Sequence, residues 1–506
     1  MEVSALSIVP PIITIVLALA TKEVYFSLII GIFSGAMIFT GGNFLQSITT
    51  FFEIMSGKIG DNVNILAFLV ILGILVAAIT RSGATKAYGE WARRTISGKK
   101  SALGVTAFLG ILIFIDDYFN CLTVGTVMRP VTDKFKIARA KLAYVIDSTA
   151  APICIIAPVS SWAAAVSSSL PEDSLVDGFV LFLQTIPFNF YAILTMIFMA
   201  FIVVSGRDFA TMRKSVDASR DEVQIPAEYK DVDESGNITG GNGKIIDLVL
   251  PLIVLIAVCI YGMLYTGGIH DGKSIADAFA DCDASQALAL GSFIALIFIS
   301  VLYLPRKVIS FSEYCECYAQ GFKAMVPAIF ILCLAWTLSG VCGDKYLNLG
   351  GYVGTIVQQH TSLAMFLPVV FFLVSICLAF ATGTSWGTFG ILIPICLSIL
   401  TNLPATDAAG LMVISIAAIL SGSVCGDHAS PISDTTILAS AGAQCNHLEH
   451  VATQVPYVAV VAACCTAGFL VAGITQSGWI GLAVSLACMA AVMFVIRAKI
   501  NSPAEN

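Results

Sequence analysis

The chain has 506 residues, of which 58% are hydrophobic and only 12% are charged, and its mean hydropathy is +0.90. Soluble domains carry about 25% charged residues, so this composition excludes a soluble protein, which would expose large apolar patches. The net charge of −7 says little about partners, because the orientation of a membrane protein depends on where Lys and Arg lie. The 15 cysteines are scattered without a CxxC pair, which indicates small packing residues rather than disulfides or a zinc site.

Uninterrupted apolar runs of the length that the hydrocarbon core of a bilayer requires occur along the whole chain. They lie at 5–21, 24–41, 62–80, 188–205, 245–265, 286–304, 324–341, 456–475 and 478–496. The first run lacks a basic segment before it and a small-residue cleavage site after it, so we interpret it as a span. The sequence therefore predicts an all-α polytopic membrane protein.

Three further apolar regions, 101–162, 362–401 and 406–443, are interrupted by polar residues, glycine and proline. Within the first region, residues 101–128 begin and end among basic residues, and they are too few for two spans of about 20 residues each. We expect a re-entrant hairpin with Asp116, Asp117 and Asn120 at its tip. Non-helical backbone at that depth requires protein or a water-filled cavity to satisfy it.

Basic residues gather in three loops, at 81–100, 129–141 and 206–244. The positive-inside rule places these loops in the cytoplasm, with the amino terminus outside and the carboxyl terminus inside. The third loop is polar and contains few large aliphatic residues, so we predict a cytoplasmic linker at 206–244 between two halves, 1–205 and 245–506.

The two halves share one pattern, an interrupted hairpin followed by a broken polar span. The segments are 114–130 and 147–162 in the first half, and 380–394 and 426–436 in the second. The predicted topology gives the two hairpins opposite orientations in the membrane. Inverted repeats with interrupted helices recur in secondary transporters. The expected fold is therefore two inverted repeats, each with a re-entrant hairpin and a broken transmembrane helix.

Acidic residues inside spans cost about 2.5–3.5 kcal/mol on insertion scales and are rare without a function. Asp147, Asp427 and Asp434 lie in the broken spans, whereas Asp117 could instead cap a helix end. His428 could sense protons or simply donate a hydrogen bond. Hydroxyl groups nearby could coordinate a dehydrated cation or only pack helices together. These candidates are Ser148, Thr149, Ser161, Thr384, Ser385, Ser430, Ser433, Thr435 and Thr436.

A buried carboxylate can hold either a proton or a cation, and exchange follows if only the loaded forms change the side they face. We expect Asp427 and Asp434 to form the core of such a site, with Asp147 as their counterpart. Trp162 and Trp386 each follow a serine in one of the broken regions. Aromatic walls suit an organic solute at least as well as a bare ion, so a sodium- or proton-coupled carrier of an organic acid or amino acid remains the alternative.

Other classes find less support in the sequence. It contains no nucleophile–base pair, metal-ligand triad, cofactor motif or P-loop, so neither an enzyme nor an ATP-driven pump is expected. The broken, acid-lined helices favour alternating access over a channel. We expect the lipid bilayer, sodium and protons as partners, and no nucleic acid, cofactor or metal other than sodium.

The run GDHASPISDTTILASAGAQCNHLEHVATQVPY at 426–457 resembles the signature of the NhaC-type sodium/proton antiporter family, and residues 115–163 resemble that family too. The resemblance implies hairpins and unwound helices around a central site, a homodimer, and a place in the bacterial inner membrane. Related carriers include a malate/lactate exchanger and suspected amino-acid transporters. The residues that match the motif are Asp117, Asn120, Asp147, Ser148, Thr149, Asp427, Ser430, Ser433, Asp434, Thr435 and Thr436.

Overall fold

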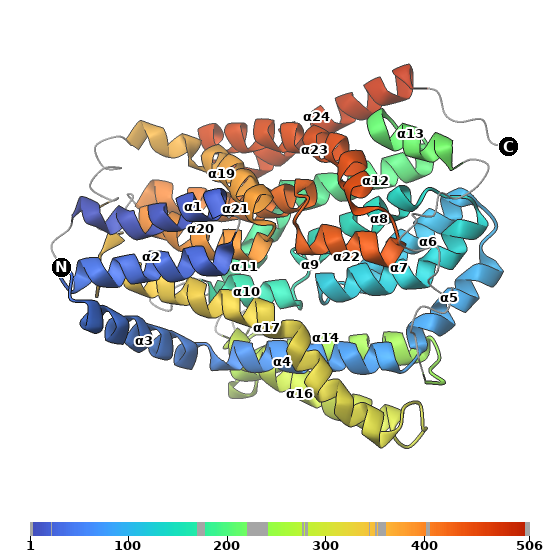
Figure 1. Cartoon of the computed structure of the whole chain (residues 1–506), viewed down its shortest axis with the longest axis horizontal. Coiled ribbons are helices and arrows are strands. Elements are labelled where there is room, and N and C mark those ends of the chain that lie inside the picture. The colour runs from blue at the N-terminus through green and yellow to red at the C-terminus, as the bar shows by residue number, and fades with distance from the viewer. Residues whose placement is uncertain are drawn as a thin grey trace.

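The structure is a computed structural model. It describes residues 4–21, 23–169, 178–219, 241–275, 278, 282–343, 345–349, 352, 361–400 and 405–500. Within these ranges the chain forms helices and their connections, and no β-strand occurs. The helices run mostly along the long axis of the molecule, and the two labelled termini lie toward its opposite ends (Figure 1).

Eight helices in the described ranges are long and apolar enough to cross a membrane, or up to ten if each bent pair counts as one span. Long elements include α4 (Val63–Arg81), α12 (Phe190–Ser205), α14 (Ile246–Thr266), α16 (Ala284–Tyr303), α19 (Leu367–Thr382), α21 (Ala405–Ala429), α23 (His447–Thr475) and α24 (Gly478–Lys499). The bent pairs are α2 (Val24–Phe39) with α3 (Phe44–Asp61), at 118°, and the two parts of α17 (Phe311–Cys342), at 42°.

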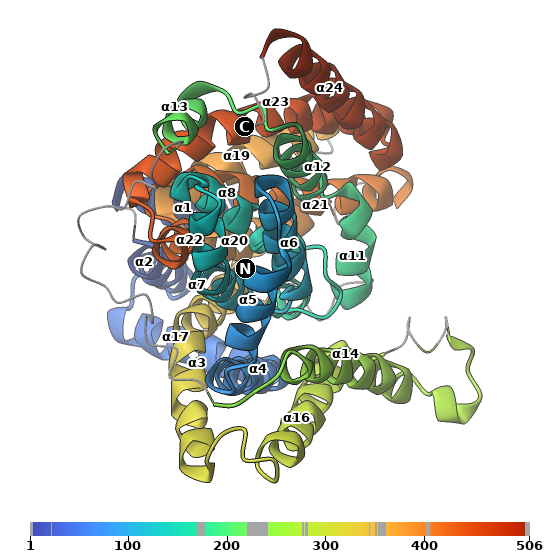
Figure 2. The ribbon, with the colours of Figure 1, turned by 90° about the vertical axis from the view of Figure 1, so that its right-hand side faces the viewer.

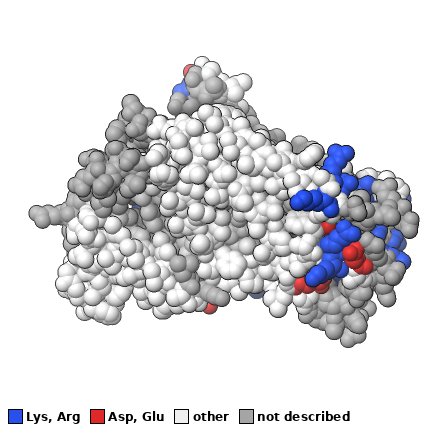
Figure 3. Space-filling view, turned by 90° about the horizontal axis from the view of Figure 1, so that it is seen from above, with Lys and Arg blue, Asp and Glu red and all other residues white. Residues whose placement is uncertain are grey.

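The surface of this helical bundle is apolar around its middle. Large hydrophobic side chains such as Leu45 and Phe494 are more than two-thirds exposed, which is favourable in lipid and unfavourable in water. On the face drawn in Figure 3, Lys and Arg gather at one end of the long axis and the middle is almost free of charge. The protein is therefore a multi-pass membrane protein, as the composition predicts.

Part of the bundle projects to one side. Viewed along the long axis, α14 and α16 lie beside α4 and the end of α17, apart from the remaining helices (Figure 2). Contacts of α4 with α16 and α17, and of α14 with α16, hold this projecting layer together. Helices α12, α21 and α23 pack against one another in the main body instead.

The predicted hairpins and broken helices are present. In the first half, α6 (Lys99–Leu112) turns into α7 (Asp117–Lys134), and α8 (Arg139–Ser148) is followed by the short α9 (Ala151–Cys154) and α10 (Ser161–Ser168). In the second half, α19 turns into α20 (Ser385–Leu400), and α21 is followed by α22 (Asp434–Ala443). Figure 1 shows α6 and α7 in one half of the molecule and α19 and α20 in the other. A symmetry relation between the repeats remains a prediction.

Local chemistry explains two of these interruptions. Gly383 ends α19 with φ +68°, a left-handed conformation that glycine adopts without the penalty of a side chain. Ser160 begins α10, where its hydroxyl accepts a hydrogen bond from the amide of Ala163 at 3.1 Å. Both breaks therefore arise from residues suited to helix ends.

Helix α22 joins the two halves, since it packs against both α7 and α8. At the crossing with α7 the backbones touch: a Cβ atom added to Gly125 would lie 2.4 Å from the carbonyl carbon of Gly442. This close approach brings the broken region of the second half against the hairpin and the broken helix of the first.

The first part of the predicted linker is folded. Residues 210–218 form α13 (Ala210–Ala218), which packs on α23 and α8 and buries Met212. Asp208, just before it, is buried and pairs with Lys141 of α8. Residues 220–240 lie outside the described residues, and the division into two halves remains a prediction.

Candidate functional site

Asp147 lies where the two halves of the chain meet. It occupies the last turn of α8 and is completely buried. Its carboxylate oxygen Oδ2 accepts hydrogen bonds from Gln454 Nε2 of α23 at 2.5 Å and from Thr436 Oγ1 of α22 at 3.4 Å. Two consecutive helices of the second half therefore converge on a carboxylate of the first half.

Two buried histidines flank this carboxylate. His428 Nε2 lies 3.8 Å from Asp147 Oδ1, and His450 Nε2 lies 3.4 Å from Oδ2. The other ring nitrogen of His428, Nδ1, is 3.1 Å from the hydroxyl of Tyr191 on α12. Gln454 Nε2 also donates to the carbonyl oxygen of His428 at 2.9 Å. Since each imidazole ring nitrogen can donate or accept a proton, this arrangement places groups that could exchange a proton directly beside the acid.

The start of α22 surrounds Asp427 of α21. Thr435 Oγ1 donates to Asp427 Oδ2 at 2.8 Å, and Thr436 Oγ1 lies 3.4 Å from the carbonyl oxygen of Asp427. Ser433 begins α22, where its hydroxyl accepts from the amide of Thr436 and contacts Thr435 Oγ1 at 3.1 Å. Asp434 is the first residue of α22, and its side chain lies outside the described part of the chain.

Other predicted ligand groups stabilise the helix breaks. Their hydroxyls bond to the main chain: Ser430 donates to Phe380, Thr149 to Val145 and Ser385 to Ser423, and Thr384 accepts from the amide of Gly387. Ser148 lines a small cavity between α8, α12 and α23 together with Tyr144, Tyr191, His428 and Gln454. These contacts are those expected of the packing alternative, and a role of these hydroxyls as ligands stays a prediction.

At the tip of the α6–α7 hairpin the adjacent acids differ in environment. Asp116 caps α7, since its carboxylate accepts from the amide of Phe119 at 3.0 Å. Asp117 is also buried, but neither of its carboxylate oxygens has a hydrogen-bond partner among the described residues. Asn120 holds the tip in place, because its amide donates to the carbonyl oxygens of Gly110, Ile113 and Thr149 at 2.7–3.0 Å.

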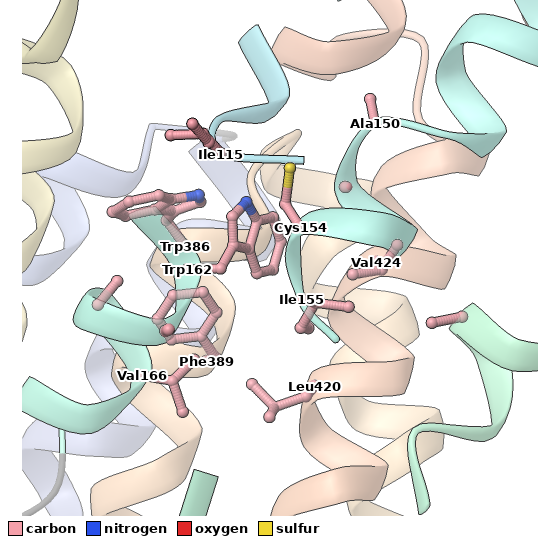
Figure 4. Packing of buried hydrophobic residues seen from close by; sticks show 14 of the residues in the cluster. Ile115, Ala150, Cys154, Ile155, Trp162, Val166, Trp386, Phe389, Leu420 and Val424 are labelled. Atoms are coloured by element: carbon pink, nitrogen blue, oxygen red, sulfur yellow. The ribbon is translucent and has the colours of Figure 1, made fainter. Parts of the chain in front are cut away.

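The two tryptophans meet across the halves. The ring centroids of Trp162 and Trp386 are 6.0 Å apart at an interplanar angle of 67°, and Phe389 packs against both rings (Figure 4). The amide of Ser161 donates to the carbonyl oxygen of Ile115 at 2.9 Å, which attaches the start of α10 to the hairpin tip. The aromatic cluster therefore adjoins the segment that carries Asp116 and Asp117.

One side chain lies near the acids of both halves. Cys121 of α7 lies within electrostatic range of Asp116, Asp117, Asp147 and Asp427. Asp117 in turn lies within electrostatic range of Asp427. The acids thus form a single buried region rather than separate interfacial caps. No group of three or more His, Cys, Asp or Glu side chains in the described ranges is arranged to hold a metal ion.

Tyr191, His450 and Gln454 did not enter the predicted site. The one available signal was that His450 and Gln454 are four residues apart, which places two polar groups on the same face of a largely apolar helix. Tyr191 lies in the first turn of an apolar span, where nothing in the sequence distinguished it from a packing residue.

Comparison with known proteins shows where this arrangement belongs. The model of the Na+/H+ antiporter family matches residues 172–474, more than half of the chain. The chain belongs to the Na+/H+ antiporter family. This confirms the resemblance seen in the motif at 426–457, and it identifies the protein as a member of a family of transporters.

Proteins that are similar to this chain in sequence or fold differ in their names. A Haemophilus influenzae protein named only as uncharacterized is 38% identical, over 98% of this chain and 96% of that one. The malate-2H+/Na+-lactate antiporter of Bacillus subtilis is 32% identical over 36% of this chain and 37% of its own. The Alcanivorax borkumensis YdaH transporter shares the fold, with a TM-score of 0.51, 14% identity and 89% coverage of each chain.

Proposed function

We propose that this secondary transporter exchanges sodium for protons by alternating access. The observation that carries the proposal is the Asp147 site, a buried carboxylate of the first half held by Thr436 and Gln454 of the second. A carboxylate enclosed in this way can bind either a proton or a cation. The same neighbouring side chains surround the carboxylate in both cases.

The surrounding groups suit both loads. When a proton is bound, His428 and His450 lie close enough to exchange it with Asp147. When sodium is bound, hard oxygen ligands are available from the Asp147 carboxylate, the Thr436 hydroxyl and the Asp427 carbonyl group. Asp427 and Asp434 complete the proposed ion site, as the motif implies.

The broken helices provide the moving parts of the proposed cycle. Thr436 stands in the first turn of α22, directly after the interruption that follows α21. A change in the angle between α21 and α22 would alter the distance from Thr436 to Asp147 on the opposite half. Ion binding at this junction is therefore coupled to the relative position of the halves.

For the cell, we propose a place in the bacterial inner membrane with the amino terminus outside. The end of the molecule where Lys and Arg gather would then face the cytoplasm (Figure 3). We also propose a homodimer, on the basis of the family resemblance.

Reconstitution in liposomes with an internal pH dye tests the exchange. Sodium pulses should move protons with the native chain and not with Asp147→Asn. Asp61→Asn is a matched control, since Asp61 is an exposed carboxylate at the end of α3. Proton movement that is equal in Asp147→Asn and native protein would contradict the proposal.

A second candidate function is coupled transport of a small organic solute. The partial similarity to a malate-2H+/Na+-lactate antiporter is one reason to consider it. The more specific reason is the aromatic cluster of Trp162, Trp386 and Phe389 beside Asp117, because a site for a bare ion does not require such walls.

A further inference from the structure

Several buried polar groups near the hairpin tip lack partners. In the described residues, no hydrogen bond is made by the Asp117 carboxylate oxygens, the Ser161 hydroxyl, or the indole nitrogens of Trp162 and Trp386. All four side chains are at most 3% exposed. An unsatisfied buried polar group destabilises a structure, and a charged one does so more strongly. Groups left unpaired together in this way indicate a place where a ligand supplies the missing partners.

These groups come from three helix starts. Asp117 is the first residue of α7, Ser161 and Trp162 begin α10, and Trp386 is in the first turn of α20. Figure 4 shows the indole nitrogens of Trp162 and Trp386 turned toward one another, near the chain at Ile115. Helix starts carry partial positive charge and favour negative groups. The indole N–H groups and the Ser161 hydroxyl add hydrogen-bond donors at these helix starts, and together these features suit a carboxylate.

The acids require the opposite charge. Asp117 lies within electrostatic range of Asp116 and Asp427, so these neighbouring carboxylates can be ionised together only if a positive group compensates them. The Trp162 indole N–H faces Asp117 and the Ser161 hydroxyl faces Asp116, but neither donor forms a hydrogen bond of standard geometry. A ligand donor directed at the two Asp117 oxygens would satisfy both.

The aromatic rings decide between sodium and an organic cation. Sodium needs a shell of hard oxygen ligands, whereas Trp162, Trp386 and Phe389 present ring faces and edges. An ammonium group gains from the face of an aromatic ring, most strongly from tryptophan. The rings also offer contact area for the carbon skeleton of an organic solute.

We propose that Asp117, Ser161, Trp162 and Trp386 bind a small organic zwitterion, a solute that carries a protonated amine next to a carboxylate. The amine pairs with Asp117, and the carboxylate accepts from Ser161 and the indoles. The site adjoins the Asp147 site, where the coupling ion binds, and uses different side chains. This inference deepens the second candidate function and rests on secondary transport.

The rings pack against one another in this structure, so the solute enters when Trp162 and Trp386 separate. They belong to α10 and α20, on opposite halves of the chain. The separation therefore uses the same relative movement of the halves that the ion site controls. This explains how ion binding and solute binding would be coupled.

Pairs of probes that differ only in the amine test the inference. Purified full-length protein is unfolded by heat in sodium buffer with L-alanine or L-lactate, L-aspartate or L-malate, and L-phenylalanine or L-phenyllactate. At least one 2-amino acid should raise the unfolding midpoint in a saturable manner, and its 2-hydroxy analogue should not. The corresponding amine without a carboxylate should also fail to raise it.

Variants locate the site. Asp117→Asn and Ser161→Ala should each weaken the apparent affinity by about tenfold or more, the equivalent of one charge-assisted hydrogen bond. Trp386→Phe should weaken it as well, because the N–H donor is lost. Trp479→Phe is the matched control, since this indole is 64% exposed on α24 and should leave binding unchanged. Ser161→Ala keeps the test valid if Asp117→Asn does not fold.

The outcomes separate this inference from sodium/proton exchange. Stabilisation by the hydroxy analogues in place of the amino acids, or unchanged affinity in both Asp117→Asn and Ser161→Ala, overturns the zwitterion site. Sodium-driven proton movement without binding of any 2-amino acid does so too, while it leaves the proposed exchange intact. Binding of an amino acid without sodium-driven proton movement supports the inference and contradicts that exchange.

Discussion

The hydroxyl of Thr436 lies 3.4 Å from the Asp147 carboxylate, although the two residues are 289 positions apart in the chain. The same hydroxyl is 3.4 Å from the Asp427 carbonyl oxygen, so its single proton is shared between two acceptors on different helices. Thr436 therefore connects the acid of the first half to the broken helix of the second.

Replacing Thr436 tests this connection. Thr436→Val keeps the side-chain shape and removes the hydroxyl, so the sodium concentration for half-maximal exchange should rise about tenfold, as for the loss of one hydrogen bond to a charged group. Thr436→Ser retains the hydroxyl and should stay close to the native value. Sodium titration of proton release in liposomes measures both. Equal sodium dependence of the valine and serine variants would rule out a role for the hydroxyl.

The side-chain amide of Gln454 should be required for rapid exchange, because it donates to the Asp147 carboxylate. Gln454→Met preserves the length of the side chain but removes the donor to both Asp147 and the His428 carbonyl group, so the maximal exchange rate should fall at least about tenfold. Gln46→Met, on the exposed surface of α3, should leave the rate unchanged. Initial rates at saturating sodium provide the comparison, and a native rate in Gln454→Met would speak against the assigned position of this amide.

The buried pair of Lys141 and Asp208 should stabilise the protein only while both partners are present. Lys141 also lies 5.9 Å from the ring centres of Tyr144 and Tyr457, and Tyr457 donates to Asp208 at 2.8 Å. Lys141→Met alone leaves a buried carboxylate without its counter-charge and should cost about 3–5 kcal/mol. Adding Asp208→Leu should restore a large part of that loss. Thermal unfolding of the two single variants and the double variant measures the coupling, and strictly additive effects would exclude it.

Close backbone packing between α7 and α22 predicts a contrast between two glycines. Gly125→Ala places a Cβ atom 2.4 Å from the carbonyl carbon of Gly442, so the helices must separate and exchange should be lost. Gly104→Ala, on α6, meets no atom within 4 Å. It should be tolerated or slightly stabilising, because alanine favours helix over glycine by about 1 kcal/mol. Proton exchange and unfolding temperature distinguish them, and full activity of Gly125→Ala would contradict the close crossing.

Local sequence patterns were sufficient for the class of fold and for the position of its interruptions. Apolar runs of spanning length predicted the membrane helices, and the hairpin at 101–128 followed from a segment too short for two spans. The polar tip of this hairpin and the motif at 426–436 also marked where helices break. These features depend on length, hydropathy and backbone conformation, all of which are properties of short segments.

The environments of individual side chains could not be obtained in this way. Asp116 and Asp117 are adjacent and identical, yet one caps α7 and the other lacks a partner among the described residues, because successive residues at a helix start point in different directions. The hydroxyls of Ser430 and Thr149 satisfy carbonyl groups that helix breaks expose, which the sequence left open between ligand and packing roles.

The sequence by itself determined that this chain crosses the membrane repeatedly and carries acids in broken helices. Only the tertiary structure decided that Asp147 meets Thr436, His450 and Gln454. The physical reason is that these contacts are made by α8, α22 and α23, whose mutual packing depends on close helix crossings such as that of Gly125 and Gly442. Such packing joins residues about 300 positions apart, and no local pattern encodes it.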